Sequence, residues 1–252
     1  MPKVAELTAL YGNFMLAPRP GPDVCDVCFN FTNGYSRCYA CGHGQLWLDA
    51  VAPISYSVAR EQLHHALKGY KRLDGEVARR FAVELAAVLW RHLVQHERCV
   101  ARAAVAERFE LVTTVPSSDP ARDPCHPLHR IVGELVAPTR ERYQRLLEPG
   151  SADAATHEFH PGKFAAAREL DGSSVLLIDD TWTTGANAQS AAAALKSAGA
   201  ERVAAVVIGR HLNREWHEND RRLRGITRPF DWDRCALCAP PAPDRIVEAG
   251  RS

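Results

Sequence analysis

The sequence contains no hydrophobic run long enough to cross a membrane. A membrane helix needs about 18 or more apolar residues in succession, whereas the longest uninterrupted run here, Val203–Gly209, has the length of a strand. Glu6 and Asn13 interrupt the apolar residues at the N-terminus, which is not typical of a secretory signal. We therefore expect a cytoplasmic protein that has no membrane partner and whose thiols are reduced.

The sequence also lacks an excess of charge of either sign. Its 31 basic and 30 acidic residues leave a formal net charge of +1, so the net charge argues against a nucleic acid as partner. The arginines between Arg221 and Arg228 fit a solvated helix face better than a binding patch. Internal repeats are absent, and 252 residues fit one large domain or a core domain with a small appendage.

Cysteine, in contrast, is abundant: the chain has eight, and six of them form Cys-x-x-Cys pairs. Cys25, Cys28, Cys38 and Cys41 have the spacing of two zinc knuckles, which together close a tetrahedral thiolate site. Such closed sites are structural, and free buried thiols or a redox pair are the alternatives. We predict an arm and a zinc module over residues 1–50, followed by an α/β domain over residues 51–252.

The third pair, Cys235 and Cys238, lies near the C-terminus. It can share a metal with one N-terminal knuckle, form a second site with His43 or another residue, or bind nothing. The spacing does not choose among these three accounts. We predict that the N-terminal four are the zinc ligands and expect the C-terminal pair to pack near them.

The rest of the chain alternates strand and helix patterns. Apolar, β-branched runs predict buried strands, and three- to four-residue periodicity predicts amphipathic helices. The expected strands are Phe109–Val115, Ser174–Ile178 and Arg202–Ile208. The expected helices are one around Leu63 and Leu67 that ends at Gly69, a long one from Gly75, a stripe from Leu128 to Val136, and Ala186–Ala198. This order predicts an α/β fold, a parallel sheet with helices on both faces.

The segment Val175–Asn187 carries the clearest chemical signal. A buried strand ends in Asp179 and Asp180, and the turn Thr183-Thr184-Gly185 then opens a helix. Ligands of open α/β sheets bind at the carboxyl ends of strands, and a helix N-terminus offers N–H groups to a phosphate. One loop therefore presents a phosphate cradle at one end and two hydroxyl acceptors at the other, which suits a phosphorylated sugar.

These residues resemble the motif of type I phosphoribosyltransferases that binds 5-phosphoribosyl-1-pyrophosphate (PRPP), with Asn187 standing where the family usually has Thr or Ser. The resemblance implies that Asp179 and Asp180 are the catalytic carboxylates and contact the ribose hydroxyls. It also implies that the 5′-phosphate is surrounded by Thr181, Thr183, Thr184, Gly185 and Ala186.

Transfer also requires a site for the leaving pyrophosphate, which Mg²⁺ usually bridges to the sugar. The loop Val115–Ser118 follows an expected strand, and its N–H groups and the hydroxyls of Ser117 and Ser118 are our candidates for PRPP's pyrophosphate. Arg122, His126, His129 and Arg130 lie just beyond. A second loop over residues 149–163, with His157, His160 and Lys163, has the composition of a lid.

The layout as a whole resembles the ComF-like family of predicted phosphoribosyltransferases over about residues 25–210. The shared features are the paired cysteine knuckles, Leu67-Lys68-Gly69-Tyr70-Lys71, Val115-Pro116 and the Asp-Asp loop. The chain departs from the family where an Arg-Gly-Phe-Asn-Gln stretch is replaced by His126–Ile131. Family members are linked to DNA uptake, a role that a motif alone does not transfer.

Three functions remain open at this stage. The first is an Mg²⁺-dependent transferase that uses PRPP and an unidentified small-molecule acceptor. The second is a non-catalytic PRPP sensor or interaction protein, and the third, for which we find no base, is a hydrolase using Cys99 or Cys125. The sequence also leaves open whether the protein is a homodimer.

Overall fold

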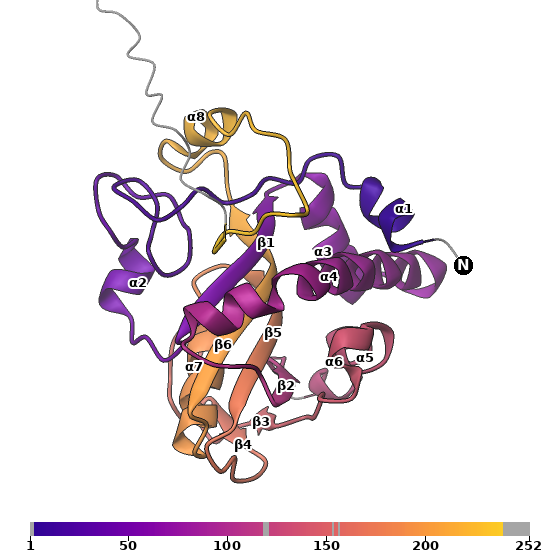
Figure 1. Ribbon diagram of the computed structural model, residues 1–252, viewed down its shortest axis with the longest axis vertical. Helices are drawn as coiled ribbons and strands as arrows, with labels where there is room; N and C mark the ends of the chain where they lie inside the picture. Colours follow the sequence, from indigo (N-terminus) through magenta and orange to yellow (C-terminus); the bar gives the residue numbers. More distant parts are fainter. Residues whose placement is uncertain (1–2, 118–120, 153, 156, 239–252) are drawn as a thin grey trace, which may run out of the picture.

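The computed structural model describes residues 3–117, 121–152, 154–155 and 157–238. In this part of the chain, four parallel strands form a sheet in the order β1-β6-β5-β2 (Figure 1). The strands are β1 (Ala50–Val58), β6 (Arg202–Leu212), β5 (Ser174–Trp182) and β2 (Leu111–Thr114). Helices flank the sheet, so the predicted fold class is confirmed.

The central strand β6 shows how the sequence produces two cores. Its side chains alternate between the faces of the sheet, as the pleat requires. Ala204, Val206 and Ile208 join the core that contains residues of α3 (Gln62–Arg72) and α4 (Gly75–Ala103). Val203, Ala205 and Val207 join the core beneath α7 (Ala186–Ser197) on the other face. Both faces are therefore apolar, which explains the uninterrupted hydrophobic run.

The helix around Leu63 and Leu67 does not end at Gly69, as the sequence predicts, but continues to Arg72. A Cβ on Gly69 would lie 2.6 Å from the Phe81 ring of α4. The glycine therefore permits a close approach of α3 to α4 rather than a helix end. The extra turn carries Tyr70 and Lys71 to the carboxyl edge of the sheet.

Strand β1 was not predicted, because Pro53 and two serines interrupt its apolar pattern. The strand lies at the edge of the sheet and pairs with β6 alone. An edge strand tolerates proline because one of its sides needs no ladder hydrogen bonds. All nine of its residues are nevertheless buried.

Short elements connect the larger ones. The expected helical stripe over 128–136 is broken into α5 (Pro127–Arg130), a π-helical turn (Ile131–Leu135) and α6 (Ala137–Arg140). A short 3₁₀ turn at Asp123–Cys125 precedes them. Strands β3 (Leu147–Pro149) and β4 (Phe164–Ala166) pair antiparallel beside α7. Helix α8 (Asn219–Arg224) follows β6.

The N-terminal residues are largely irregular and are fastened to the sheet by hydrogen bonds. They include α1 (Val4–Ala9), which packs on α4, and α2 (Tyr39–His43) within the cysteine segment (Figure 1). The Tyr56 hydroxyl donates to the Phe29 carbonyl at 2.7 Å, and Arg210 Nε donates to the Cys28 carbonyl at 3.0 Å. Both donors come from strands, so the cysteine segment is held directly on the edge of the sheet.

The core of β6 predicts a large stability effect. Ile208→Ala should lower the free energy of unfolding by about 2–5 kcal/mol, because it leaves a cavity at a fully buried position. Val94→Ala, at a position 56% exposed on α4, should change it by roughly 0.5 kcal/mol or less. Urea unfolding followed by circular dichroism measures both. Equal losses would contradict the assigned core.

Candidate functional site

The loop between β5 and α7 forms at the carboxyl edge of the sheet, where the sequence predicts a phosphate cradle. Strand β5 continues through Asp179 and Asp180 to Trp182, and α7 begins at Ala186. The Ala186 N–H donates to the Thr184 hydroxyl at 3.3 Å, which satisfies one of the free N–H groups of the first turn. The turn thus leads directly from a rigid strand into a twelve-residue helix.

Gly185 closes this turn and cannot be replaced by a larger residue without strain. Its φ of 86° lies in the left-handed region, and an added Cβ would lie 2.1 Å from the Trp182 ring. Trp182 itself is buried, and its indole Nε1 has no hydrogen-bond partner among the described residues. The backbone at Gly185 therefore packs against the indole ring, and only a glycine permits this close approach.

Asp180 is buried at the wall of the site and is held by the last turn of α3. Its carboxylate accepts a hydrogen bond from the Tyr70 hydroxyl and forms an ion pair with Lys71. Burial alone would raise the pKa of Asp180, but the charge and hydrogen bond of Lys71, together with the Tyr70 hydroxyl, outweigh it and lower the pKa below its usual value. Asp180 is therefore an anion at neutral pH.

Asp179 has the opposite tendency although it is the adjacent residue. It is partly exposed, and its Oδ1 accepts the Asp180 N–H at 2.8 Å. Burial, and then the negative charge of Asp180, raise the pKa of Asp179 to about 7. Neighbouring carboxylates with separated pKa values are typical of functional sites.

The two aspartates and the turn open onto a pocket of about 1230 Å³. Every predicted ribose-phosphate residue from Asp179 to Ala186 lines it, as do Ser117, His126 and His157. The pocket is rich in basic and imidazole side chains, supplied by α3, the 115–127 segment and β6: His64, Lys68, Lys71, Arg72, Arg122 and His211. This lining suits a ligand that carries several negative charges.

The 115–118 loop reaches the pocket at Ser117, whereas Ser118 lies outside the described residues. The Ser117 N–H, one of the groups predicted to hold pyrophosphate, donates to Asp123 Oδ1 at 2.8 Å. Asp123 is buried, pairs with Arg145, and lies 3.5 Å from His129 Nε2. Asp123 thus holds the loop in place through these contacts. The sequence did not indicate this role, because Asp123 is one of several charged residues in a polar loop.

The other candidates beyond this loop divide between the pocket and the scaffold. His126 lines the pocket, and burial lowers its pKa to about 4, so its ring is neutral at pH 7. His160 donates its N–H to Ser190, and Lys163 donates to the Ala155 carbonyl at 2.6 Å. Of the predicted lid, only His157 lines this pocket among the described residues. His160 ties the loop to α7, and Lys163 bonds within the loop.

The structure adds Tyr70 and Lys71 to the site. The sequence marks both as part of a family pattern but does not assign them a role. The sequence does contain a signal for that role: a tyrosine and a lysine lie at the end of one helix, and two adjacent aspartates lie near the end of one strand. Only the continuation of α3 past Gly69 brings the two together.

Cys25, Cys28, Cys38 and Cys41 form the first of two ligand clusters in the described part of the chain. All four are buried, and their sulfurs lie within 4.8 Å of one another. The Cys28 and Cys38 sulfurs are 3.6 Å apart, close to the spacing of about 3.8 Å that a tetrahedral thiolate zinc imposes. The cluster can therefore hold a structural metal such as zinc.

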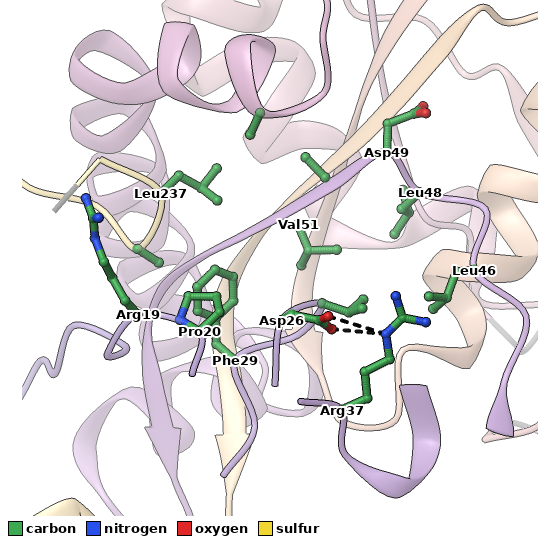
Figure 2. A pocket seen from close by; sticks show the side chains of 14 residues that line it. Arg19, Pro20, Asp26, Phe29, Arg37, Leu46, Leu48, Asp49, Val51 and Leu237 are labelled. Carbon is green, nitrogen blue, oxygen red and sulfur yellow. Dashed lines mark hydrogen bonds and ion pairs between the residues drawn. The ribbon is translucent and has the colours of Figure 1, made fainter. Parts of the chain in front are cut away.

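Cys235 and Cys238 belong to a different cluster, which the sequence left unassigned. Their sulfurs gather with His96 and Cys99 of α4, within 4.8 Å of one another, and this cluster too can hold a structural metal. Leu237, which lies between the two cysteines, lines one pocket together with Asp26 of the N-terminal segment (Figure 2). The partners of the cysteine pair, however, are neither His43 nor the N-terminal cysteines.

No protein-family model matches the chain, and no curated protein matches its sequence. No helix in the described ranges is both long and apolar enough to cross a membrane.

The Trp182–Gly185 contact makes a prediction for the phosphate loop. Gly185→Ala should destabilise the protein by about 1–3 kcal/mol more than Gly172→Ala, measured by urea unfolding. Gly172 is the matched control, because its φ is also positive, at 78°, but an added Cβ there meets nothing within 4 Å. Equal losses for the two variants would show that the indole does not support the turn.

Proposed function

We propose that the pocket between α3 and the β5–α7 loop binds PRPP with Mg²⁺, and that the protein transfers the phosphoribosyl group to an unidentified nitrogen nucleophile. One observation carries the proposal. Two carboxylates and a hydroxyl-glycine turn at a helix N-terminus line the same basic pocket, in the order that a ribose 5-phosphate requires.

The 5′-phosphate fits the turn. The N-terminus of α7 attracts an anion through its free N–H groups and its dipole. The Thr183 and Thr184 hydroxyls line the pocket beside it, and Gly185 lets the backbone approach the ligand closely.

The ribose hydroxyls would then donate to Asp179 and Asp180, at the other end of the loop. Asp180 is kept ionised by Lys71, so it can accept a hydrogen bond at neutral pH. Asp179 is the more exposed acid and is free to change its protonation state as ligand arrives.

The pyrophosphate end needs positive charge, and the pocket supplies it through Lys68, Lys71, Arg72 and Arg122. Asp179 is the residue that would hold a bound Mg²⁺, which would neutralise the negative charge of the leaving pyrophosphate. Zn²⁺ at Cys25, Cys28, Cys38 and Cys41 would be structural, since four thiolates leave no open position for chemistry.

A PRPP sensor without turnover is the second candidate. It is favoured by the Ser117–Asp123 hydrogen bond, because an N–H group expected to hold the leaving pyrophosphate is already occupied. Release of pyrophosphate separates the two functions.

The ribose-phosphate site is tested by calorimetric titration of PRPP with Mg²⁺. Asp180→Asn should weaken binding about 10- to 150-fold, corresponding to the 1.5–3 kcal/mol of a hydrogen bond to a charged group. Asp171→Asn, an exposed acid at the opposite end of β5, should bind like wild type. Folded wild type that binds no PRPP would refute the site, and pyrophosphate release with a panel of amines and bases would identify an enzyme.

The raised pKa of Asp179 predicts a pH dependence. Hydroxyl donors prefer the carboxylate, so ligand binding must displace the proton when the pH is below about 7. The affinity for PRPP should therefore rise from pH 6 to pH 7.5, by up to about tenfold per pH unit below the pKa.

Asp179→Asn is the control for this profile, because the phosphates of PRPP titrate in the same range. The variant should keep only the pH dependence that comes from those phosphates. Parallel profiles for wild type and variant would show that Asp179 does not contact the ligand.

A further inference from the structure

We propose that His96, Cys99, Cys235 and Cys238 form a second zinc site, which clamps the C-terminal segment onto helix α4. The inference does not depend on the ribose-phosphate site. His96 and Cys99 are three residues apart on α4 and so share one face of the helix. Cys235 and Cys238 form a Cys-x-x-Cys knuckle, a tight turn that presents two sulfurs toward that face.

The distances among the donor atoms are those of a tetrahedral site. Cys238 Sγ lies 3.6 Å from His96 Nδ1, and Cys99 Sγ lies 3.9 Å from the same atom. Zinc bonds of about 2.3 Å to sulfur and 2.0–2.1 Å to nitrogen place such atoms roughly 3.5–3.6 Å apart. The Cys235 and Cys238 sulfurs, at 3.2 Å, are closer than the ideal of about 3.8 Å, so a small side-chain rotation completes the tetrahedron.

The surroundings of His96 prepare it as a ligand. Its Nε2 lies 2.7 Å from the Trp232 carbonyl, which can only accept a hydrogen bond. The ring proton is therefore on Nε2, and Nδ1 faces the sulfurs with a free lone pair. Metal-binding histidines are oriented in this way by a carbonyl or carboxylate.

The knuckle is prepared in a similar manner. The Cys235 N–H donates to Cys238 Sγ at 3.3 Å, which stabilises a thiolate there. A redox-active pair needs only two cysteines, whereas His96 and Cys99 supply a third and a fourth donor to the same centre. Three thiolates and one imidazole leave no open position, so the ion is structural and zinc is the expected metal.

The clamp has a defined consequence for the fold. The segment after α8 has no further helix or strand among its described residues, up to Cys238. It is attached to α4 by Arg91, whose guanidinium lies 4.5 Å from the Trp232 ring, and by the 3.0 Å hydrogen bond from Gln95 to Asp233. A metal at the knuckle would add covalent bonds between α4 and the end of this segment.

The knuckle also forms a wall of a second pocket. Ala236 and Leu237 lie between the two cysteines and line a pocket of about 470 Å³ with Val27, Phe29 and Val51 (Figure 2). Val27 lies between Cys25 and Cys28 of the other cluster. Residues of both knuckles therefore line this pocket, and loss of the C-terminal metal would release the wall that carries Leu237.

Metal content of the purified full chain tests the proposal. Wild type should carry two zinc ions, one per cluster, and Cys235→Ser should carry one. Cys125→Ser, a matched control at an exposed cysteine outside both clusters, should keep two. One zinc in wild type, unchanged in Cys235→Ser, would overturn the proposal, as would a Cys235–Cys238 disulfide in the protein as purified from reducing conditions.

Two further measurements keep the test decisive if Cys235→Ser fails to fold. His96→Cys should keep two metal ions and, after replacement by Co²⁺, should show a stronger thiolate-to-cobalt absorption than wild type. A chelator should remove the C-terminal metal several-fold faster than the N-terminal one, because Cys238 is exposed whereas the N-terminal cysteines are all buried. An unchanged cobalt spectrum in His96→Cys would exclude residue 96 as a ligand and refute the site.

Discussion

The buried Asp180 carboxylate is the constraint around which the site is arranged. An ionised carboxylate away from water is costly unless it is paired and hydrogen-bonded. Lys71 and Tyr70 supply both interactions, and they lie on the last turn of α3. The end of α3 is thereby tied to the end of β5, so one pair of contacts satisfies the charge and builds a wall of the pocket.

The same contact separates the roles of the two adjacent acids. Burial raises the pKa of Asp179, and the negative charge that Lys71 and Tyr70 stabilise on Asp180 raises it further, to about 7. A fixed anion thus lies beside an acid that titrates near neutral pH. Identical residue types acquire different chemistry from their surroundings alone.

Much of the fold follows from local pattern, whereas the site depends on contacts between distant segments. The strand before Asp179 and the long helix after Gly75 were predictable, because their side chains alternate or repeat in register with one core. Strand β1 was not, since an edge position tolerates Pro53. A glycine in this position predicts a helix end, because the sequence does not show that Gly69 packs against the Phe81 ring.

The cysteines illustrate the same limit. The N-terminal four were predictable as a set because their spacing is local, whereas Cys235 and Cys238 find their partners on α4, more than a hundred residues earlier. One local signal was present: His96 and Cys99 lie one helical turn apart, a spacing that lets two side chains share a ligand. The sequence alone could not show that Cys235 and Cys238 lie beside His96 and Cys99.

The two sides of the pocket differ in how firmly they are held, and the proposed transfer depends on this difference. The β5–α7 turn is fixed by Trp182 and by the helix that follows it, so the N–H groups proposed to hold a phosphate would require little rearrangement. The facing loop is held by Asp123, which accepts the Ser117 N–H and pairs with Arg145. A pyrophosphate that reached this loop would compete with Asp123 for that N–H group, and like charges would oppose its approach. Arg145 reduces this repulsion because it pairs with Asp123. The basic residues of α3, which also line the pocket, would attract the pyrophosphate. Under the proposed function, binding of the sugar phosphate would depend on a preformed turn, whereas departure of pyrophosphate would require the hydrogen bonds and ion pair of Asp123 to rearrange.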